Sequence, residues 1–219
     1  MSHVTLVRHG QANTEARDED SYDRLSDLGH QQARWLGDHF QASGERFARV
    51  YSGTLRRHRE TAAGLGAQNH AEVIEDARLN ELEYFTMAAL YQDQFQRPLP
   101  EDREDFAEHM PALFEAWEDG SLKGAPESHA DFAERVTGAI HDIAAGDGRA
   151  LVVTSGGVIG MTLSVTMGLQ MRQMSRTTLM ILNTSLHRFQ PLGGALSLSQ
   201  FNAVPHLEHP ERQFAQTHI

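Results

Sequence analysis

Short apolar runs alternate with longer segments of helical spacing over most of the chain. The strongest run, residues 150–154, reads ALVVT, and a similar run at residues 4–7 reads VTLV, as expected of strands buried on both faces. Between such runs apolar residues recur three and four positions apart, which is typical of amphipathic helices. The predicted strands are residues 4–7, 49–51, 73–74 and 150–154, and the predicted helices are residues 28–40, 54–65, 132–143 and 156–169.

This alternation predicts an α/β protein with three layers, α/β/α, around a mostly parallel open sheet. The pattern changes in residues 84–128, which are acidic, helical in spacing and interrupted by prolines. We interpret that segment as a helical cap inserted into a single domain of residues 1–219. After it, residues 179–182, 185–189 and 196–201 have strand-like composition, with Gly193-Gly194 as a predicted hairpin turn.

Polar and charged residues follow several of these strands directly. Arg8 and His9 come after the first strand, Arg57 lies in the turn after the second, and Glu81 follows the third. Ser155-Gly156-Gly157 follows the fourth. Because ligands of open α/β sheets bind at the carboxyl ends of the strands, we expect these residues to line one pocket.

Their chemistry suits a phosphate ester. His9 is a plausible nucleophile, since a neutral imidazole is available near pH 7. Arg8 and Arg57 offer planar guanidinium groups that grip phosphate oxygens in pairs. Glu81 is placed to act as the acid that protonates the leaving alcohol. Gly10 would let the backbone approach the ligand closely.

Composition limits the other classes of function. The chain has 219 residues, a net charge of −11 and no cysteine. The charge disfavours nucleic acid and anionic membranes as partners, and the absence of cysteine removes disulfides and thiolate chemistry. No apolar stretch approaches the length of a membrane span, so we expect a cytoplasmic protein. A homodimer is compatible with the sequence, which leaves the oligomeric state open.

Four stretches, in order along the chain, resemble motifs of the histidine phosphatase superfamily, whose fold is phosphoglycerate mutase-like. Arg8-His9-Gly10 resembles its RHG signature, and residues 25–33 resemble its L-[ST]-x-x-G-x-x-Q-A stretch. Residues 51–62 resemble the segment with the second phosphate-binding arginine, and residues 79–81 the segment with the acidic proton donor. The resemblance extends from about residue 4 to residue 201.

The resemblance implies a phosphatase that acts on a small phosphorylated substrate without a metal or another cofactor. His9 would form a phosphohistidine that water then hydrolyses. Arg8 and Arg57 would hold the phosphoryl group, while Glu81 would serve first as general acid and then as general base.

One departure lies after the last predicted parallel strand. The stretch VVTSGG at residues 152–157 aligns with a family stretch that reads VVTHGG, so Ser155 stands where a second active-site histidine is expected. Serine brings no charge, and the loss of one preorganised donor costs about 10²–10³ in rate. The amides of Gly156 and Gly157 are still expected to cradle an anion with Ser155. His187 is a candidate replacement only because it lies near a predicted strand.

A second departure lies in the first loop, where many relatives carry an asparagine six positions after the nucleophile. This chain has Glu15 there, so either Asn13 takes over the phosphate contact or the loop turns away. The loop also lacks the pattern of true mutases, which favours hydrolysis.

Three hypotheses follow from these residues. The first is a phosphomonoesterase that works through phosphohistidine. The second, motivated by Ser155, is a catalytically impaired member of the fold that binds a phosphorylated ligand or regulates. The third is an unrelated metal-dependent hydrolase, although the histidines offer no convincing metal site. The sequence does not identify the substrate.

Overall fold

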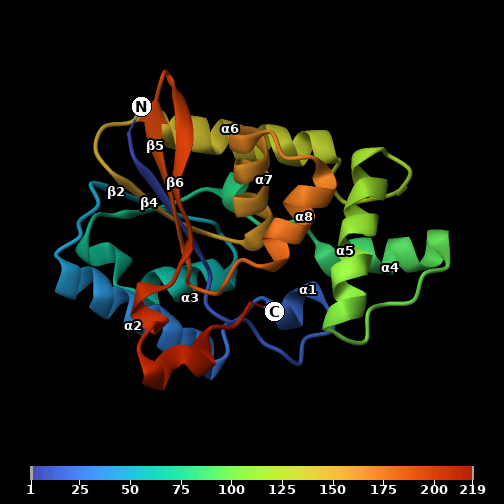
Figure 1. Ribbon diagram of the computed structural model, residues 1–219, viewed down its shortest axis with the longest axis horizontal. Helices are drawn as coiled ribbons and strands as arrows, with labels where there is room; N and C mark the ends of the chain where they lie inside the picture. The colour runs from blue at the N-terminus through green and yellow to red at the C-terminus, as the bar shows by residue number, and fades with distance from the viewer. Residues whose placement is uncertain (1, 219) are drawn as a thin grey trace.

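Residues 2–218 are described by a computed structural model, in which six strands form one sheet (Figure 1). The strand order is β3-β2-β4-β1-β5-β6. The first four strands in this order are parallel, whereas β5 and β6 run antiparallel to their neighbours. The sheet is therefore open and mostly parallel, as predicted. The strands are β1 (Val4–Arg8), β2 (Arg49–Ser52), β3 (Val73–Glu75), β4 (Ala150–Thr154), β5 (Leu186–Leu192) and β6 (Ala195–Ala203).

Strands β1 and β4 lie side by side at the centre of the sheet. Their register runs from Val4 opposite Ala150 to Arg8 opposite Thr154. All ten residues are buried because both faces of the sheet are covered, which explains their continuous apolar runs. Both strands end at the same edge, and the His9 amide extends the pairing by donating to the Thr154 carbonyl at 2.8 Å.

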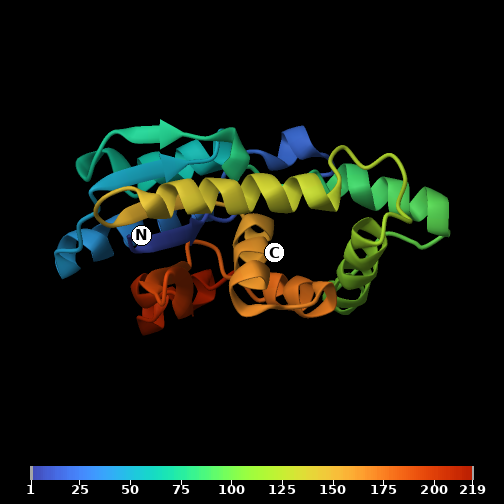
Figure 2. The same ribbon diagram turned by 90° about the horizontal axis from the view of Figure 1, so that it is seen from above.

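Helices cover both faces of the sheet (Figures 1 and 2). Residues of α2 (Asp27–Ser43) and α3 (Arg56–Gly64) pack with Val7 and Val153 on one face. Residues of α6 (His129–Ala145) and α7 (Gly156–Met167) pack with Leu6 and Val152 on the other. The side chains of β1 and β4 alternate between these two layers, as strand geometry requires. The predicted three-layer α/β/α architecture is thus confirmed.

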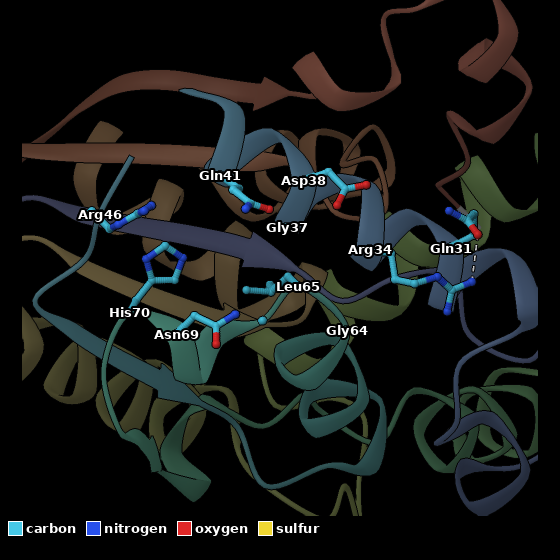
Figure 3. A pocket seen from close by; sticks show the side chains of 11 residues that line it. Gln31, Arg34, Gly37, Asp38, Gln41, Arg46, Gly64, Leu65, Asn69 and His70 are labelled. Atoms are coloured by element: carbon cyan, nitrogen blue, oxygen red, sulfur yellow. Dashed lines mark hydrogen bonds between the residues drawn. The ribbon is translucent and has the colours of Figure 1, made fainter. Parts of the chain in front are cut away.

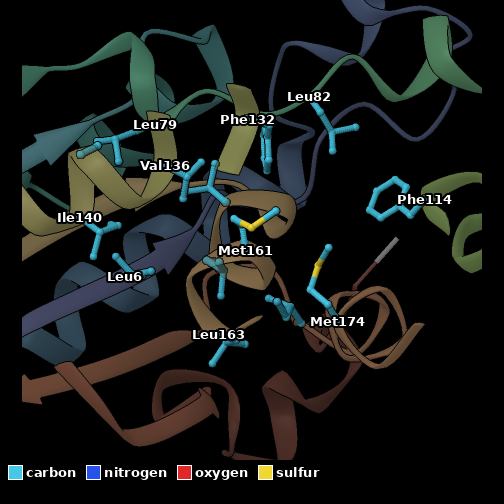
Figure 4. Packing of buried hydrophobic residues seen from close by; sticks show 14 of the residues in the cluster. Leu6, Leu79, Leu82, Phe114, Phe132, Val136, Ile140, Met161, Leu163 and Met174 are labelled. Carbon is cyan, nitrogen blue, oxygen red and sulfur yellow. The ribbon is translucent and has the colours of Figure 1, made fainter. Parts of the chain in front are cut away.

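The larger core lies on the α6 and α7 side (Figure 4). Leu6 of β1 meets Val136 and Ile140 of α6 and Met161 of α7 in one apolar cluster. The same cluster continues past the sheet to Phe114. It therefore joins the sheet to the acidic segment of residues 84–128.

That acidic segment contains α4 (Tyr84–Phe95) and α5 (Arg103–Glu118), which lie beyond one end of the sheet (Figures 1 and 2). Helix α5 packs against α8 (Met171–Leu179). Leu113 and Phe114 are fully buried on α5. The segment is therefore helical, and its apolar face is anchored to the remainder of the fold.

Short elements complete the chain. Helix α1 (Glu19–Tyr22) forms in the first loop, where the Asp18 carboxylate accepts from the Ser21 amide at 2.7 Å. The other short elements are the 3₁₀ helices η1 (Ala67–Asn69), η2 (Ala77–Leu79), η3 (Pro205–Leu207) and η4 (Pro210–Ala215).

One predicted strand is wrong, and one predicted turn is confirmed. Residues 179–182 are not a strand, because α8 continues to Leu179 and a loop follows it. Only Leu179 of this apolar run is helical; it ends α8, whose Met171 and Met174 are buried in the core. The hairpin between β5 and β6 turns at Gly193 and Gly194, whose φ angles of 60° and 86° favour glycine.

Between residues 2 and 218, no helix is long and apolar enough to cross a membrane.

Candidate active site

A cavity of about 230 Å³ opens at the carboxyl ends of β1 and β4, between the sheet and helices α4 and α5. Part of its wall is charged or polar, and a larger part is apolar. Its charged and polar lining includes Arg8, Glu19, Tyr22, Arg57, Glu81, Gly156, Gly157, Thr178 and His218. Its apolar lining includes Leu82, Tyr84, Phe85, Phe106, Met110, Phe114 and Leu179.

His9 lies directly behind this lining, at the end of β1, with 2% of its surface exposed. Its Nδ1 lies 2.7 Å from the Gly10 carbonyl oxygen, so Nδ1 carries the hydrogen and donates it. Nε2 is therefore the unprotonated atom, as a nucleophile requires. Burial, together with the charges of Arg57 and Arg8, lowers the pKa of His9 well below its usual value of 6.5.

The glycine after His9 is required by packing within the protein. A methyl group on Gly10 would overlap the carbonyl oxygen of Gly29 in α2, and a methyl group on Gly29 would overlap the Gln11 carbonyl. The Gly10 amide also donates to Thr61 Oγ1 of α3 at 3.0 Å. The glycine thus locks the loop after β1 against α2 and α3, which differs from the close approach to a ligand that we expected from the sequence.

The Arg8 guanidinium reaches the cavity wall from the end of β1. Its Nη1 donates to the carbonyl oxygens of Ile181 and His218, the second at 2.6 Å. Burial lowers the pKa of Arg8, while the neighbouring Tyr22 and Glu81 raise it. The loop after α8 and the C-terminal segment thus orient this arginine together.

The Arg57 guanidinium comes from the first turn of α3 and is 3% exposed. Its Nη1 donates to Asp23 Oδ1 at 2.9 Å. The same carboxylate accepts from the amides of Arg56 and Arg57, so it caps a helix whose N-cap residue, Leu55, offers no side-chain acceptor. Asp23 therefore fixes both α3 and the arginine fork.

The short helix α1 forms the wall in front of the nucleophile. The Tyr22 ring stands edge-on to His9 with 6.3 Å between ring centroids, and the Arg57 guanidinium lies 5.1 Å from the Tyr22 centroid. Glu19 joins this wall to α4, because its Oε1 accepts from the Phe85 amide at 2.7 Å. Burial raises the pKa of Glu19.

Glu81 approaches from the loop after η2. Its Oε2 accepts from the Gly157 amide at 2.8 Å, and its Oε1 accepts from the Leu82 amide at 3.0 Å. A methyl group on Gly157 would overlap Oε1. The carboxylate is therefore held at the N-terminus of α7, and position 157 has to be glycine for it to lie there.

Ser155 is fully buried behind Gly156, and its partner is a histidine that the sequence analysis missed. His58 Nε2 lies 2.6 Å from Ser155 Oγ. The His58 ring centroid is 5.8 Å from that of His9. The sequence analysis singled out Arg57 but not the residue after it, and the position of His58 next to Arg57 was the only local signal for it.

Three other residues considered from the sequence lie outside the cavity lining. Asn13 Nδ2 donates to the Ser21 carbonyl, and Asn13 Oδ1 accepts from the Glu15 amide, so this side chain stabilises the first loop. Glu15 is exposed and turned to solvent. His187 lies in β5, with Nε2 bonded to Ser185 Oγ at 2.9 Å, and does not replace the missing histidine.

A second hollow of about 480 Å³ lies over α2 and the end of α3 (Figure 3). Arg34, Asp38, Arg46 and His70 line it, with none of the strand-end residues. Within residues 2–218, no group of three or more histidine or acidic residues is arranged to hold a metal ion.

Comparison with known proteins places this geometry in context. The model of the histidine phosphatase superfamily (branch 1) matches residues 4–204. No curated protein sequence matches the chain.

Several solved structures share the fold. Bacillus stearothermophilus YhfR superposes with a TM-score of 0.70 at 22% identity, covering 95% of this chain and 100% of its own. Phosphoserine phosphatase from Entamoeba histolytica superposes with a TM-score of 0.69 at 17% identity, covering 94% of this chain and 100% of its own. Phosphoglycerate mutase from Bacillus anthracis superposes with a TM-score of 0.67 at 20% identity, covering 94% of each chain. At these identities the likeness establishes the fold.

Proposed function

The chain belongs to the histidine phosphatase superfamily, and from this premise we propose that it hydrolyses phosphomonoesters through a phosphohistidine at His9. One observation carries the proposal. His9 Nδ1 is anchored on the Gly10 carbonyl, which leaves Nε2 unprotonated, and the charges of two buried arginines that line the cavity act on this imidazole. A buried imidazole that is kept neutral beside two cations is suited to attack an anionic phosphoryl group.

In the first step, His9 Nε2 attacks phosphorus and the ester P–O bond breaks. The carboxylic acid of Glu81 gives its proton to the departing alkoxide. In the second step, the Glu81 carboxylate takes a proton from water while the water oxygen attacks phosphorus. The P–N bond then breaks, inorganic phosphate leaves, and both His9 and Glu81 return to their starting states.

The two arginines and the helix N-terminus would hold the charge that moves during these steps. Arg8 and Arg57 offer guanidinium N–H groups beyond those bound to Ile181, His218 and Asp23. The amide of Gly156 lies at the positive end of α7. Since Tyr22 stands in front of His9, we infer that helix α1 swings aside when substrate binds.

We further infer that α4 and α5 act as a cap that selects esters of apolar alcohols. The far wall of the cavity contains Phe85, Phe106 and Phe114. Among the described lining residues, Arg8 and Arg57 are the only arginines, and lysine is absent. The described lining therefore offers a second anionic group no further permanent cation, whereas an aryl or alkyl group would bury apolar surface against it.

Trapping of the intermediate tests the reaction. We expect wild-type protein mixed with ³²P-labelled phenyl phosphate and quenched in alkali to carry label on His9, because phosphohistidine survives alkali. His9→Ala should lose the label and at least about 10³ of kcat. The control is His141→Ala on the exposed face of α6, which should match wild type. Wild-type protein that binds inorganic phosphate but neither takes label nor turns over would instead support a binding or regulatory protein.

A substrate panel tests the cap. We expect kcat/KM for 1-naphthyl phosphate to exceed that for 3-phosphoglycerate by at least about tenfold. This factor corresponds to about 1.4 kcal/mol of transition-state stabilisation from burial of the apolar ring system. A preference for 3-phosphoglycerate would contradict the apolar cap and leave the phosphohistidine mechanism intact.

A further inference from the structure

We propose that His58, acting through Ser155, is a positioning residue for phosphoryl transfer. It makes the Ser155 hydroxyl a directed donor to the transferring group. The proposal rests on the phosphatase function above and extends its machinery to a residue on α3. Its basis is the placement of a second imidazole, from outside the VVTSGG stretch, against the serine that follows β4.

The two side chains form a buried pair next to the nucleophile. His58 and Ser155 are both fully buried, and His58 Nε2 lies 2.6 Å from Ser155 Oγ. The His58 ring centroid is 5.8 Å from that of His9, with 37° between the ring planes. Two buried imidazoles and a hydroxyl therefore lie together behind a cavity that Arg57 and Gly156 line.

Ser155 does not have the usual role of a serine at its position. It is the N-cap of α7, where a serine hydroxyl normally accepts a hydrogen bond from an amide of the first turn. The Ser155 side chain makes no such bond, and the Gly157 amide donates to Glu81. The hydroxyl is thus oriented by His58, and α7 loses the usual cap.

The surroundings of His58 decide which way the hydrogen bond runs. Nδ1 is buried, has no hydrogen-bond partner within residues 2–218, and faces Gly53, where a methyl group would overlap it. A buried N–H without an acceptor is rarer than an acceptor without a donor, so the ring proton belongs on Nε2. His58 then donates to Ser155 Oγ, and the hydroxyl hydrogen remains free.

The free hydroxyl hydrogen gives the pair its function. In the described chain, Ser155 Oγ has His58 as its only hydrogen-bond partner, so its hydrogen is available to an oxygen of the phosphoryl group. A hydroxyl that already accepts a hydrogen bond is a stronger donor, because chained hydrogen bonds polarise one another. The pair thus supplies a preorganised donor where charge develops on the phosphoryl oxygens.

The arrangement changes the expectation for Ser155→His. A histidine at position 155 would occupy space that the His58 ring already fills, so this variant alone should lose activity and stability. On the sequence alone, which has Ser155 where a second histidine is expected, this variant would be taken to restore that histidine. Only removal of the first ring, in the double variant His58→Ala/Ser155→His, makes room for the second.

Steady-state kinetics on phenyl phosphate test the proposal. We expect His58→Ala and Ser155→Ala each to lower kcat by about 10²–10³ with KM changed much less, as for the loss of one preorganised donor. The double alanine variant should be no slower than either single variant, because both act through one hydroxyl. His58→Gln, which keeps an N–H donor, and His58→Ala/Ser155→His should each recover at least tenfold over His58→Ala.

The matched control is Arg59→Ala, one residue along α3 and exposed, which should keep wild-type kcat. A folded His58→Ala protein with kcat within twofold of wild type overturns the proposal. A double alanine variant whose loss of kcat equals the product of the losses in the two single variants also overturns it. Should the variants unfold, a crystal structure of wild-type protein with orthovanadate decides. Ser155 Oγ within hydrogen-bonding distance of a vanadate oxygen supports the proposal, and Oγ turned away overturns it. Phosphohistidine labelling at His9 is measured separately, so failure of the reaction itself is recognised.

Discussion

Gly157→Ala should displace Glu81, the proposed general acid, and leave the nucleophile His9 in place. A methyl group at this position would overlap Glu81 Oε1 and lie 3.1 Å from the carboxyl carbon. The Glu81 side chain therefore has to rotate, and its 2.8 Å hydrogen bond from the Gly157 amide is lost. The backbone of α7 itself tolerates alanine, which has the higher helix propensity.

The magnitude depends on the leaving group. A positioned general acid contributes about 10²–10⁴ to the rate, or about 3–5 kcal/mol at 1.36 kcal/mol for each factor of ten. An alkoxide needs the full contribution, because it is a strong base that departs poorly without a proton. 4-Nitrophenolate needs little of it, because it is stable as an anion near neutral pH.

The assay is kcat/KM at pH 7 for hexyl, phenyl and 4-nitrophenyl phosphate. This ratio reports the first step, in which the alcohol departs, and excludes the second step, in which Glu81 acts as base on the same intermediate for every ester. We expect Gly157→Ala to lose about 10²–10⁴ on hexyl phosphate, less on phenyl phosphate and less than about tenfold on 4-nitrophenyl phosphate. The control is Gly138→Ala, within α6, where a new methyl group meets only Arg78 Nη1 at 4.0 Å. An equal loss on all three esters, or no loss on any, would refute the placement of Glu81 as the acid.

Three further predictions concern stability and binding. Burial lowers the pKa of His187 and of His206 to about 3. Below pH 6.5 these histidines therefore bind protons in the unfolded chain but stay neutral in the native state. The free energy of unfolding should then fall with decreasing pH, by up to about 1.4 kcal/mol per pH unit for each histidine. Urea unfolding between pH 7.5 and 5 measures this slope, and a flat profile would contradict it. Asp23→Ala should lower the free energy of unfolding by about 1–2 kcal/mol through loss of the α3 cap. It should also raise KM by freeing the Arg57 fork, with Asp23→Asn intermediate in both measurements. Phe114→Ala should cost about 3–5 kcal/mol in stability and reduce kcat/KM for aryl phosphates more than for glycerol phosphate; an unchanged urea midpoint would show that Phe114 is not packed as described.

The local pattern of the sequence was sufficient for the architecture and for the edge of the sheet where the cavity lies. The continuous apolar runs of β1 and β4 report burial on both faces, and that burial fixes which loops meet. Arg8, Arg57 and Glu81 line one cavity because each follows a strand or begins the next helix at that edge.

Side chains that join the site only through tertiary packing could not be predicted from the local sequence pattern. His58 was not predicted, because helical spacing indicates only which face of the helix a residue occupies. It does not indicate that the side chain would contact Ser155, 97 positions away in the sequence. Asp23 was not singled out from the sequence, because the helix that it caps begins more than thirty residues later. Residues 179–182 were predicted as a strand because four successive apolar residues have the composition of one, although Leu179 ends α8 and residues 180–182 form the loop after it.

The attachment of the C-terminal segment has a practical consequence for recombinant work. Gln32 Nε2 donates to the Ala215 carbonyl and to Thr217 Oγ1, and the His218 carbonyl accepts from Arg8 inside the cavity wall. Ser2, in contrast, is bound to the Ala144 carbonyl at the opposite edge of the sheet. A variant or fusion that displaces residues 215–218 would therefore move the arginine that grips the substrate, and its kinetics would report a lower activity than the undisturbed chain has.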